Sequence, residues 1–147
     1  GTDRWVRTLD SSEKVQVLPD VVLISRAGSP VAESHALGLD AQDGGVLWQS
    51  EGWGLWLEQD SYRQVGNTLV ANMIFAHEEH PSELAGINFR QGTCRWALET
   101  QPSELGVCGG IVFPLRRGKS VDLSDGSILW TWEPSAFIEY GYGGPPS

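Results

Sequence analysis

The hydrophobic residues of this chain occur in short runs separated by turns rich in Gly, Asp, Asn and Pro. Apolar runs of this kind are typical of β-strands, and no stretch keeps a helical period over three turns. We therefore expect strands at residues 15–18, 21–25, 34–40, 46–49, 61–65, 68–76, 84–89, 94–98, 103–107, 111–115, 120–123 and 128–132. Residues 1–8 are expected to form the last strand of an incomplete unit.

One motif returns three times along the chain. In each copy an Asp or Asn precedes a Trp by eight residues, a Gly by four and a small residue by ten. The Gly permits positive φ in a hairpin turn, and the Asp or Asn side chain can accept hydrogen bonds from turn N–H groups. The copies are Asp40, Gly44 and Trp48, then Asn88, Gly92 and Trp96, then Asp122, Gly126 and Trp130, with Gly38, Gly86 and Ser120 as the small residues.

The tryptophans are spaced at the length of a repeat unit. A partial copy ends at Trp5, and from there the Trp-to-Trp intervals are 43, 48 and 34 residues. Units of this size with four strands each indicate blades of a β-propeller, which stack to bury their faces. The sequence predicts one all-β segment, with a partial blade at 1–9, blades at about 14–50, 58–99 and 103–133, and a tail at 134–147.

The repeat resembles that of the pyrroloquinoline-quinone (PQQ) propeller family, whose pattern is Ala-x-Asp-x-x-Thr-Gly-x-x-x-Trp. The Thr position departs from that pattern, being Asp43, Gln91 and Asp125. The resemblance implies propeller blades of four antiparallel strands. Each Trp is expected to project into the gap between blades and to pack on the small residue of a neighbour.

Three blades and a fraction leave two sheet faces open, which is a large apolar surface. We therefore expect a piece of a longer propeller, self-association through the open blade faces, or a protein partner. The net charge of −9 makes nucleic acid and anionic membrane surfaces poor partners. No apolar run reaches the roughly 18 residues of a membrane span. The chain begins at Gly1 without Met, so an upstream targeting segment can have been removed and the localisation is open.

Few residues suggest chemistry. His77-Glu78-Glu79-His80 is the only cluster of metal-ligand type, and it is interpreted as a solvated loop because no third ligand is evident. His35 is interpreted as a hydrogen-bonded histidine of the core or rim. Cys94 and Cys108 are expected to be buried thiols, with a disulfide as the alternative. No catalytic motif is found, and no cofactor or metal is expected.

Two tryptophans exceed what the repeat requires. Trp53 and Trp56, in Gly52–Leu57, are interpreted as a connection between blades that packs into the core. The alternative is an exposed aromatic patch that binds a partner, to which Tyr140 and Tyr142 of the tail can contribute.

The sequence thus favours a non-catalytic protein-binding or scaffold module. The resemblance supports this interpretation, because the family includes assembly-factor propellers and propeller sensor domains. Two alternatives are a fragment of a PQQ-dependent quinoprotein dehydrogenase and a propeller that binds carbohydrate. The resemblance implies a vicinal disulfide and a calcium site in such dehydrogenases, and this chain has no adjacent Cys pair.

Overall fold

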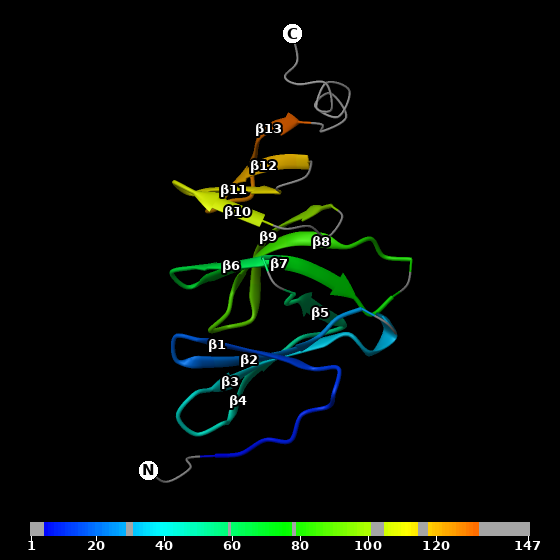
Figure 1. The fold of residues 1–147 in the computed structure, drawn as a ribbon, viewed down its shortest axis with the longest axis vertical. Helices are drawn as coiled ribbons and strands as arrows, with labels where there is room; N and C mark the ends of the chain where they lie inside the picture. Colours follow the sequence, from blue (N-terminus) through cyan, green and yellow to red (C-terminus); the bar gives the residue numbers. More distant parts are fainter. Residues whose placement is uncertain are drawn as a thin grey trace, which may run out of the picture.

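The computed structural model describes residues 5–28, 31–58, 60–77, 79–100, 105–114 and 118–132. Within these ranges the chain forms three antiparallel sheets, and the single helical element is a short 3-10 turn, η1 (Val31–Glu33). The sheets are stacked one above another along the longest axis of the molecule (Figure 1). The predicted all-β class and the propeller blades of antiparallel strands are confirmed.

Blade 1 is a sheet of four strands in sequence order. It contains β1 (Lys14–Leu18), β2 (Val21–Arg26), β3 (His35–Asp40) and β4 (Val46–Gln49). All four predicted strands are present, with ends that differ from the prediction by no more than one residue.

Blade 2 has five strands because two short strands share one edge of its longest strand. β5 and β6 pair side by side along β7, which is followed by β8 and β9. The bounds are β5 (Trp53–Trp56), β6 (Tyr62–Val65), β7 (Thr68–Phe75), β8 (Glu83–Asn88) and β9 (Thr93–Glu99).

The presence of β5 corrects the interpretation of Gly52–Leu57 as a connection outside a blade that starts at residue 58. β5 pairs with β7 and also lies against blade 1. A Cβ on Gly54 would lie 2.0 Å from the carbonyl oxygen of Arg26, so only glycine allows this approach. Strand formation here depends on a long-range contact that a local pattern does not reveal.

Blade 3 repeats the order of blade 1. It contains β10 (Leu105–Cys108), β11 (Ile111–Pro114), β12 (Gly118–Asp122) and β13 (Ile128–Trp132). The residues beyond Trp132, including Tyr140 and Tyr142, lie outside the part of the chain that the structure describes.

A bulge recurs at one position of all three blades. The register between the last two strands of each blade shifts directly after the small residue of the motif, between Gly38 and Leu39 in blade 1. The same shift follows Gly86 in blade 2 and Ser120 in blade 3. A bulge re-aims the side chains that follow it, and here it precedes the motif turn in each copy.

The core lies mainly between blades. One buried cluster joins blade 1 to blade 2, with Leu23 and Trp48 on one side and Leu69 and Phe89 on the other. A second cluster joins blade 2 to blade 3 through Val70, Leu84, Trp96, Leu105, Val112 and Val121. Neighbouring residues of a strand point to opposite faces, so a blade supplies side chains to both of its neighbours.

The N-terminal segment, residues 5–13, crosses blade 1 without forming a strand. Its Trp5 packs on the blade-1 residues Ile24, Leu37 and Leu39, on a face that blade 2 does not cover. The prediction of a strand over residues 1–8 is therefore wrong for residues 5–8, which have no ladder partner in the described structure. No described helix is long and apolar enough to cross a membrane.

Candidate functional site

The motif turns have one hydrogen-bonding scheme. In blade 1 the carbonyl of Asp40 accepts the Gly44 N–H at 2.8 Å, and the Asp40 carboxylate accepts the Gln42 N–H at 2.7 Å. Asn88 and Asp122 make the corresponding two bonds in their own blades. The Asp or Asn of the motif thus closes its turn from within, a role that its short polar side chain suits.

The departure from the family pattern also has a local role in two turns. The Asp43 carboxylate accepts the Gly45 N–H at 2.8 Å, and the Asp125 carboxylate accepts the Ser127 N–H at 2.8 Å. An Asp at this position satisfies a backbone donor of the turn, as its short side chain allows.

The indoles of the repeat bind the turn of the following blade. Each donates its N–H to the carbonyl oxygen of the residue after the Asp or Asn. The pairs are Trp5 with Ala41 at 3.0 Å, Trp48 with Phe89 at 2.6 Å and Trp96 with Leu123 at 2.8 Å. We call residues 40–45, 88–92 and 122–126 the indole-binding turns.

The glycine of each indole-binding turn lies directly under the incoming ring. Gly44, Gly92 and Gly126 have φ values of 75°, 73° and 74°. A Cβ on these residues would lie 2.4 to 2.6 Å from atoms of Trp5, Trp48 and Trp96 respectively. Both the backbone conformation and the space therefore require glycine.

The small residue of the motif has a different partner from the one expected. Gly38 is paired across the ladder with Trp48 of its own blade, and a Cβ there would lie 2.1 Å from the Trp48 Nε1 atom. Gly86 and Trp96 repeat this arrangement in blade 2. The small residue thus makes room for the indole of its own blade, and the prediction that it receives a neighbour's ring is wrong.

The third tryptophan has no indole-binding turn among the described residues. Trp130 is 50% exposed, whereas Trp48 and Trp96 are 9% and 7% exposed. Ile128 and Leu129 of the same strand are also exposed, but so are the equivalent Val46 and Leu47 of blade 1, so only the tryptophan differs from its counterparts. We call the side of blade 3 on which Trp130 lies the blade-3 face.

The extra tryptophans belong to the junction between blades 1 and 2. Trp53 stacks on Trp48 with ring centroids 5.9 Å apart and packs on the core, and its carbonyl accepts the Ser50 hydroxyl at 2.6 Å. Trp56 is half-buried, with a ring atom 3.9 Å from the Cβ position of Gly28. This geometry favours the packing interpretation for both residues.

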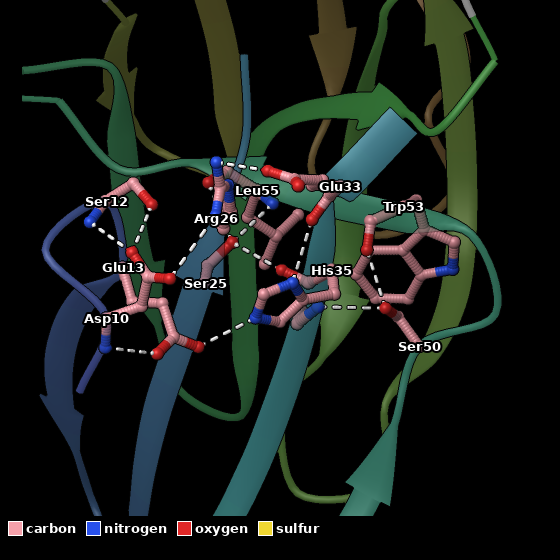
Figure 2. A network of polar contacts seen from close by, with 11 residues as sticks. Asp10, Ser12, Glu13, Ser25, Arg26, Glu33, His35, Ser50, Trp53 and Leu55 are labelled. Carbon is pink, nitrogen blue, oxygen red and sulfur yellow. Dashed lines mark hydrogen bonds and ion pairs between the residues drawn. The ribbon is translucent and has the colours of Figure 1, made fainter. Parts of the chain in front are cut away.

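A polar network fastens the end of the N-terminal segment to blade 1 (Figure 2). Arg26 forms ion pairs with Asp10, at 3.5 Å, and with Glu33. The Nε2 atom of His35 lies 2.7 Å from a carboxylate oxygen of Glu13. Since Arg26 and His35 are paired across β2 and β3, the network gathers at one end of the blade, and Trp5 binds at the other.

The contacts of Glu13 in this network change its pKa. Partial burial raises the pKa of Glu13, but the hydrogen bond from His35 and a backbone hydrogen bond at Asp10 outweigh it, so that the pKa is lowered overall. The other ring nitrogen of His35 faces the Glu33 carbonyl at 2.9 Å. Both ring nitrogens of His35 thus lie within hydrogen-bonding distance of oxygen atoms.

A hollow of about 580 Å³ opens between blades 2 and 3 at the end that carries the motif turns. Its wall includes Arg95, Asp122, Ser124 and Leu129. Hydrogen bonds from the Ser124 hydroxyl and N–H lower the pKa of Asp122. The charged groups of this hollow are therefore one guanidinium and one carboxylate that is already used by its own turn.

The loop interpreted as a solvated charged segment makes local contacts. The His80 ring stacks on the Phe75 ring with centroids 3.8 Å apart. The Nδ1 atom of His80 donates to the Pro81 carbonyl at 2.9 Å. Within the described ranges no group of three potential metal ligands occurs.

The cysteines differ from the expectation of buried thiols. Cys94 and Cys108 are free and exposed. Their strands, β9 and β10, belong to different blades, and neither residue is part of a buried hydrophobic cluster.

The solved structures that are similar to this chain include a BamB and a methanol dehydrogenase. BamB from Moraxella catarrhalis has 19% sequence identity and a TM-score of 0.50, covering 79% of this chain and 34% of its own. A europium-containing methanol dehydrogenase has 11% identity and a TM-score of 0.54, covering 79% of this chain and 23% of its own. No family model and no curated protein matches the sequence.

These likenesses concern the fold, and they support the PQQ-like propeller that the repeat predicts. This chain spans about a third of the length of the first structure and about a quarter of the second.

The sequence predicted which side chains form the turns, but not the backbone carbonyls that accept hydrogen bonds from the indoles. Ala41, Phe89 and Leu123 accept the indole N–H groups through backbone carbonyls, and a backbone acceptor leaves no mark on residue type. The network of Asp10, Glu13 and Arg26 also has no local signal, because Asp10 and Glu13 are far in sequence from their ion-pair partners Arg26 and His35.

Proposed function

We propose that this chain is a non-catalytic protein-binding or scaffold module, and that the blade-3 face is its binding surface. The observation that supports the proposal is the contrast between equivalent tryptophans. Trp48 and Trp96 are buried by the next blade, whereas Trp130 is half-exposed. Trp130 thus has the position in the repeat of a residue that binds a turn.

The chemistry of the surface defines its partner. Buried Trp residues are among the strongest contributors to protein interfaces, particularly where an aromatic ring enters a fitted pocket. The other repeat tryptophans bind a positive-φ glycine and a backbone carbonyl acceptor. A protein turn of this type is therefore the expected ligand, and the net charge of −9 disfavours nucleic acid.

The binding test uses a fragment of the chain as a defined probe. An unlabelled cyclic peptide of residues 83–99, with Cys94→Ser to prevent disulfides, carries the blade-2 indole-binding turn. It is added to the ¹⁵N-labelled chain, whose Trp130 indole N–H resonance is identified with Trp130→Phe. We expect that resonance to move, because the indole N–H gains an acceptor.

A matched peptide with Gly92→Val serves as the control, since a Cβ at this glycine occupies the space of the ring. An unchanged Trp130 resonance at millimolar peptide would refute the proposed surface. So would an equal response to the Gly92→Val peptide.

The dehydrogenase-fragment alternative draws on the similarity of fold to the methanol dehydrogenase. It requires that the chain bind a quinone in a metal-dependent manner. Isothermal titration of PQQ with and without calcium tests it, and saturable calcium-dependent binding would favour the alternative over the scaffold proposal.

A further inference from the structure

The described structure has an exposed motif tryptophan at one end and a turn that binds an indole at the other. Blade 3 presents Trp130 without an indole-binding turn, and blade 1 presents an indole-binding turn that Trp5 fills. Figure 1 places these two features at opposite ends of the stack of blades. Building on the proposed binding surface, we propose that Trp130 of a second copy of this chain displaces Trp5 from the blade-1 turn. Copies would then associate head to tail.

The blade-1 turn has the geometry needed to bind another motif tryptophan. Its glycine, Gly44, has a φ of 75°, against 73° and 74° in the turns that bind Trp48 and Trp96. The acceptor of the indole N–H is in each case the carbonyl after the Asp or Asn. A turn that binds Trp5 in this way therefore has the same chemistry to offer Trp130.

The donor side matches in backbone register. Trp130 is paired across its ladder with Ser120, as Trp48 is paired with Gly38, and the same bulge follows the small residue in both blades. Ser120 carries a Cβ, whereas a Cβ on Gly38 would lie 2.1 Å from the Trp48 ring, so the Trp130 indole is placed differently over its partner residue. The shared strand register thus presents the Trp130 indole toward a turn.

Trp5 is held less firmly than the other bound indoles. Trp48 and Trp96 belong to four-residue or longer strands of complete sheets, whereas Trp5 belongs to a segment outside any ladder. The segment exposes Val6 at 84%. Its far end is fastened by side chains at the surface, including the Asp10 ion pair with Arg26 (Figure 2).

The arrangement makes the N-terminal segment an internal competitor of assembly. While Trp5 fills the blade-1 turn, the chain can donate an indole but cannot accept one there. When the segment leaves, each copy has one donor and one acceptor surface. Contacts of this heterologous kind form a closed ring if the rotation closes, and otherwise a filament.

The test compares four forms of the chain: wild type, Trp5→Ala, Trp130→Ala and the double variant. Their masses are measured by sedimentation equilibrium over a range of concentrations. We expect Trp5→Ala to associate at least about tenfold more tightly than wild type, the size of effect typical of a buried aromatic anchor. The double variant should behave as a monomer, because it has an acceptor without a donor.

The double variant also provides a directional test. Because it accepts an indole but cannot donate one, it should cap assemblies of Trp5→Ala and lower their mean mass when mixed with them. Val6→Ala is the matched control in the same segment, since its side chain is exposed, and it should leave the mass of the wild-type chain unchanged.

A competition experiment covers the case in which Trp5→Ala perturbs the fold. A peptide of residues 1–13 should dissociate the Trp5→Ala assemblies by refilling the turn, and its Trp5→Ala version should not. Association that persists in the double variant would overturn the proposal. So would a folded Trp5→Ala chain with the mass of wild type. In that last case a response of Trp130 to the turn peptide would leave the proposed binding surface intact.

Discussion

The interface tryptophans provide the most direct quantitative test of this architecture. Trp48 is 9% exposed and donates a buried hydrogen bond to the Phe89 carbonyl at 2.6 Å, whereas Trp130 is 50% exposed. An indole buries about 150–250 Å², worth about 4–6 kcal/mol at about 25 cal/mol per Å². Truncation of Trp48 also leaves the Phe89 carbonyl without its donor, at a cost of about 1–3 kcal/mol.

We therefore expect Trp48→Ala to lower the free energy of unfolding by about 5–9 kcal/mol, a large share of the 5–15 kcal/mol typical of a domain. Trp130→Ala should lower it by about 2 kcal/mol, because only half of the ring leaves water in the first place. Urea titrations followed by far-UV circular dichroism measure both losses without relying on the fluorescence of the replaced residue.

Phenylalanine variants separate the hydrogen bond from the packing and keep the protein folded. Trp48→Phe should still cost about 1–3 kcal/mol, since a buried carbonyl loses its partner. Trp130→Phe is the matched control and should cost less than about 0.5 kcal/mol, as is usual for exposed substitutions. Equal losses for the two phenylalanine variants would refute the role given to the indole N–H.

Three further predictions concern the turns and the network. Gly92→Ala should destabilise the chain by about 3 kcal/mol or more, because the Cβ would lie 2.4 Å from the bound indole. The control is Gly66→Ala, which also has positive φ but has open space around the Cβ, and it should cost about 1 kcal/mol. The same urea titrations measure both losses. The pKa of Glu13 is lowered in the folded state, so its contribution is present above its unfolded pKa of about 4.3 and is lost as pH falls through the folded value. The stability difference between wild type and Glu13→Gln should accordingly shrink below about pH 4.3, and a constant difference down to pH 3 would contradict this. Ser124→Ala should raise the pKa of Asp122 toward the ordinary value of about 3.9, as measured by carboxyl ¹³C NMR, because the Ser124 hydroxyl is the main cause of its lowering.

The sequence predicted the blades well because their signals are local. The motif turns depend on residues within five positions of one another, such as Asp40, Gln42 and Gly44, and their hydrogen bonds follow from residue type. The strand bounds follow from apolar runs between these turns. All-β blades and the tryptophan positions were therefore within reach of the sequence.

The contacts between blades were less accessible. β5 is a strand because Gly54 lets the backbone approach Arg26, which is 28 residues earlier in the chain. The indole N–H of Trp48 binds a backbone carbonyl 41 residues later. Neither partner is marked by its side chain, so local pattern could not assign strand β5 or the hydrogen-bond acceptor of Trp48.

The approach of Gly54 to Arg26 has a mechanical consequence. Blades 1 and 2 meet there backbone to backbone, and the Ser25 hydroxyl bridges them by donating to the Leu55 carbonyl at 2.9 Å and accepting the Leu55 N–H at 2.7 Å. Such a junction cannot adjust by rotation of side chains, because backbone atoms form the contact. Blades 2 and 3 meet mainly through side chains, with Val70 and Leu84 of blade 2 against Val112 and Val121 of blade 3, and through one backbone hydrogen bond from the Leu105 N–H to the Asp60 carbonyl at 2.8 Å. Under a pulling force between the two ends, blade 3 should detach first while blades 1 and 2 remain together as a single stiff element.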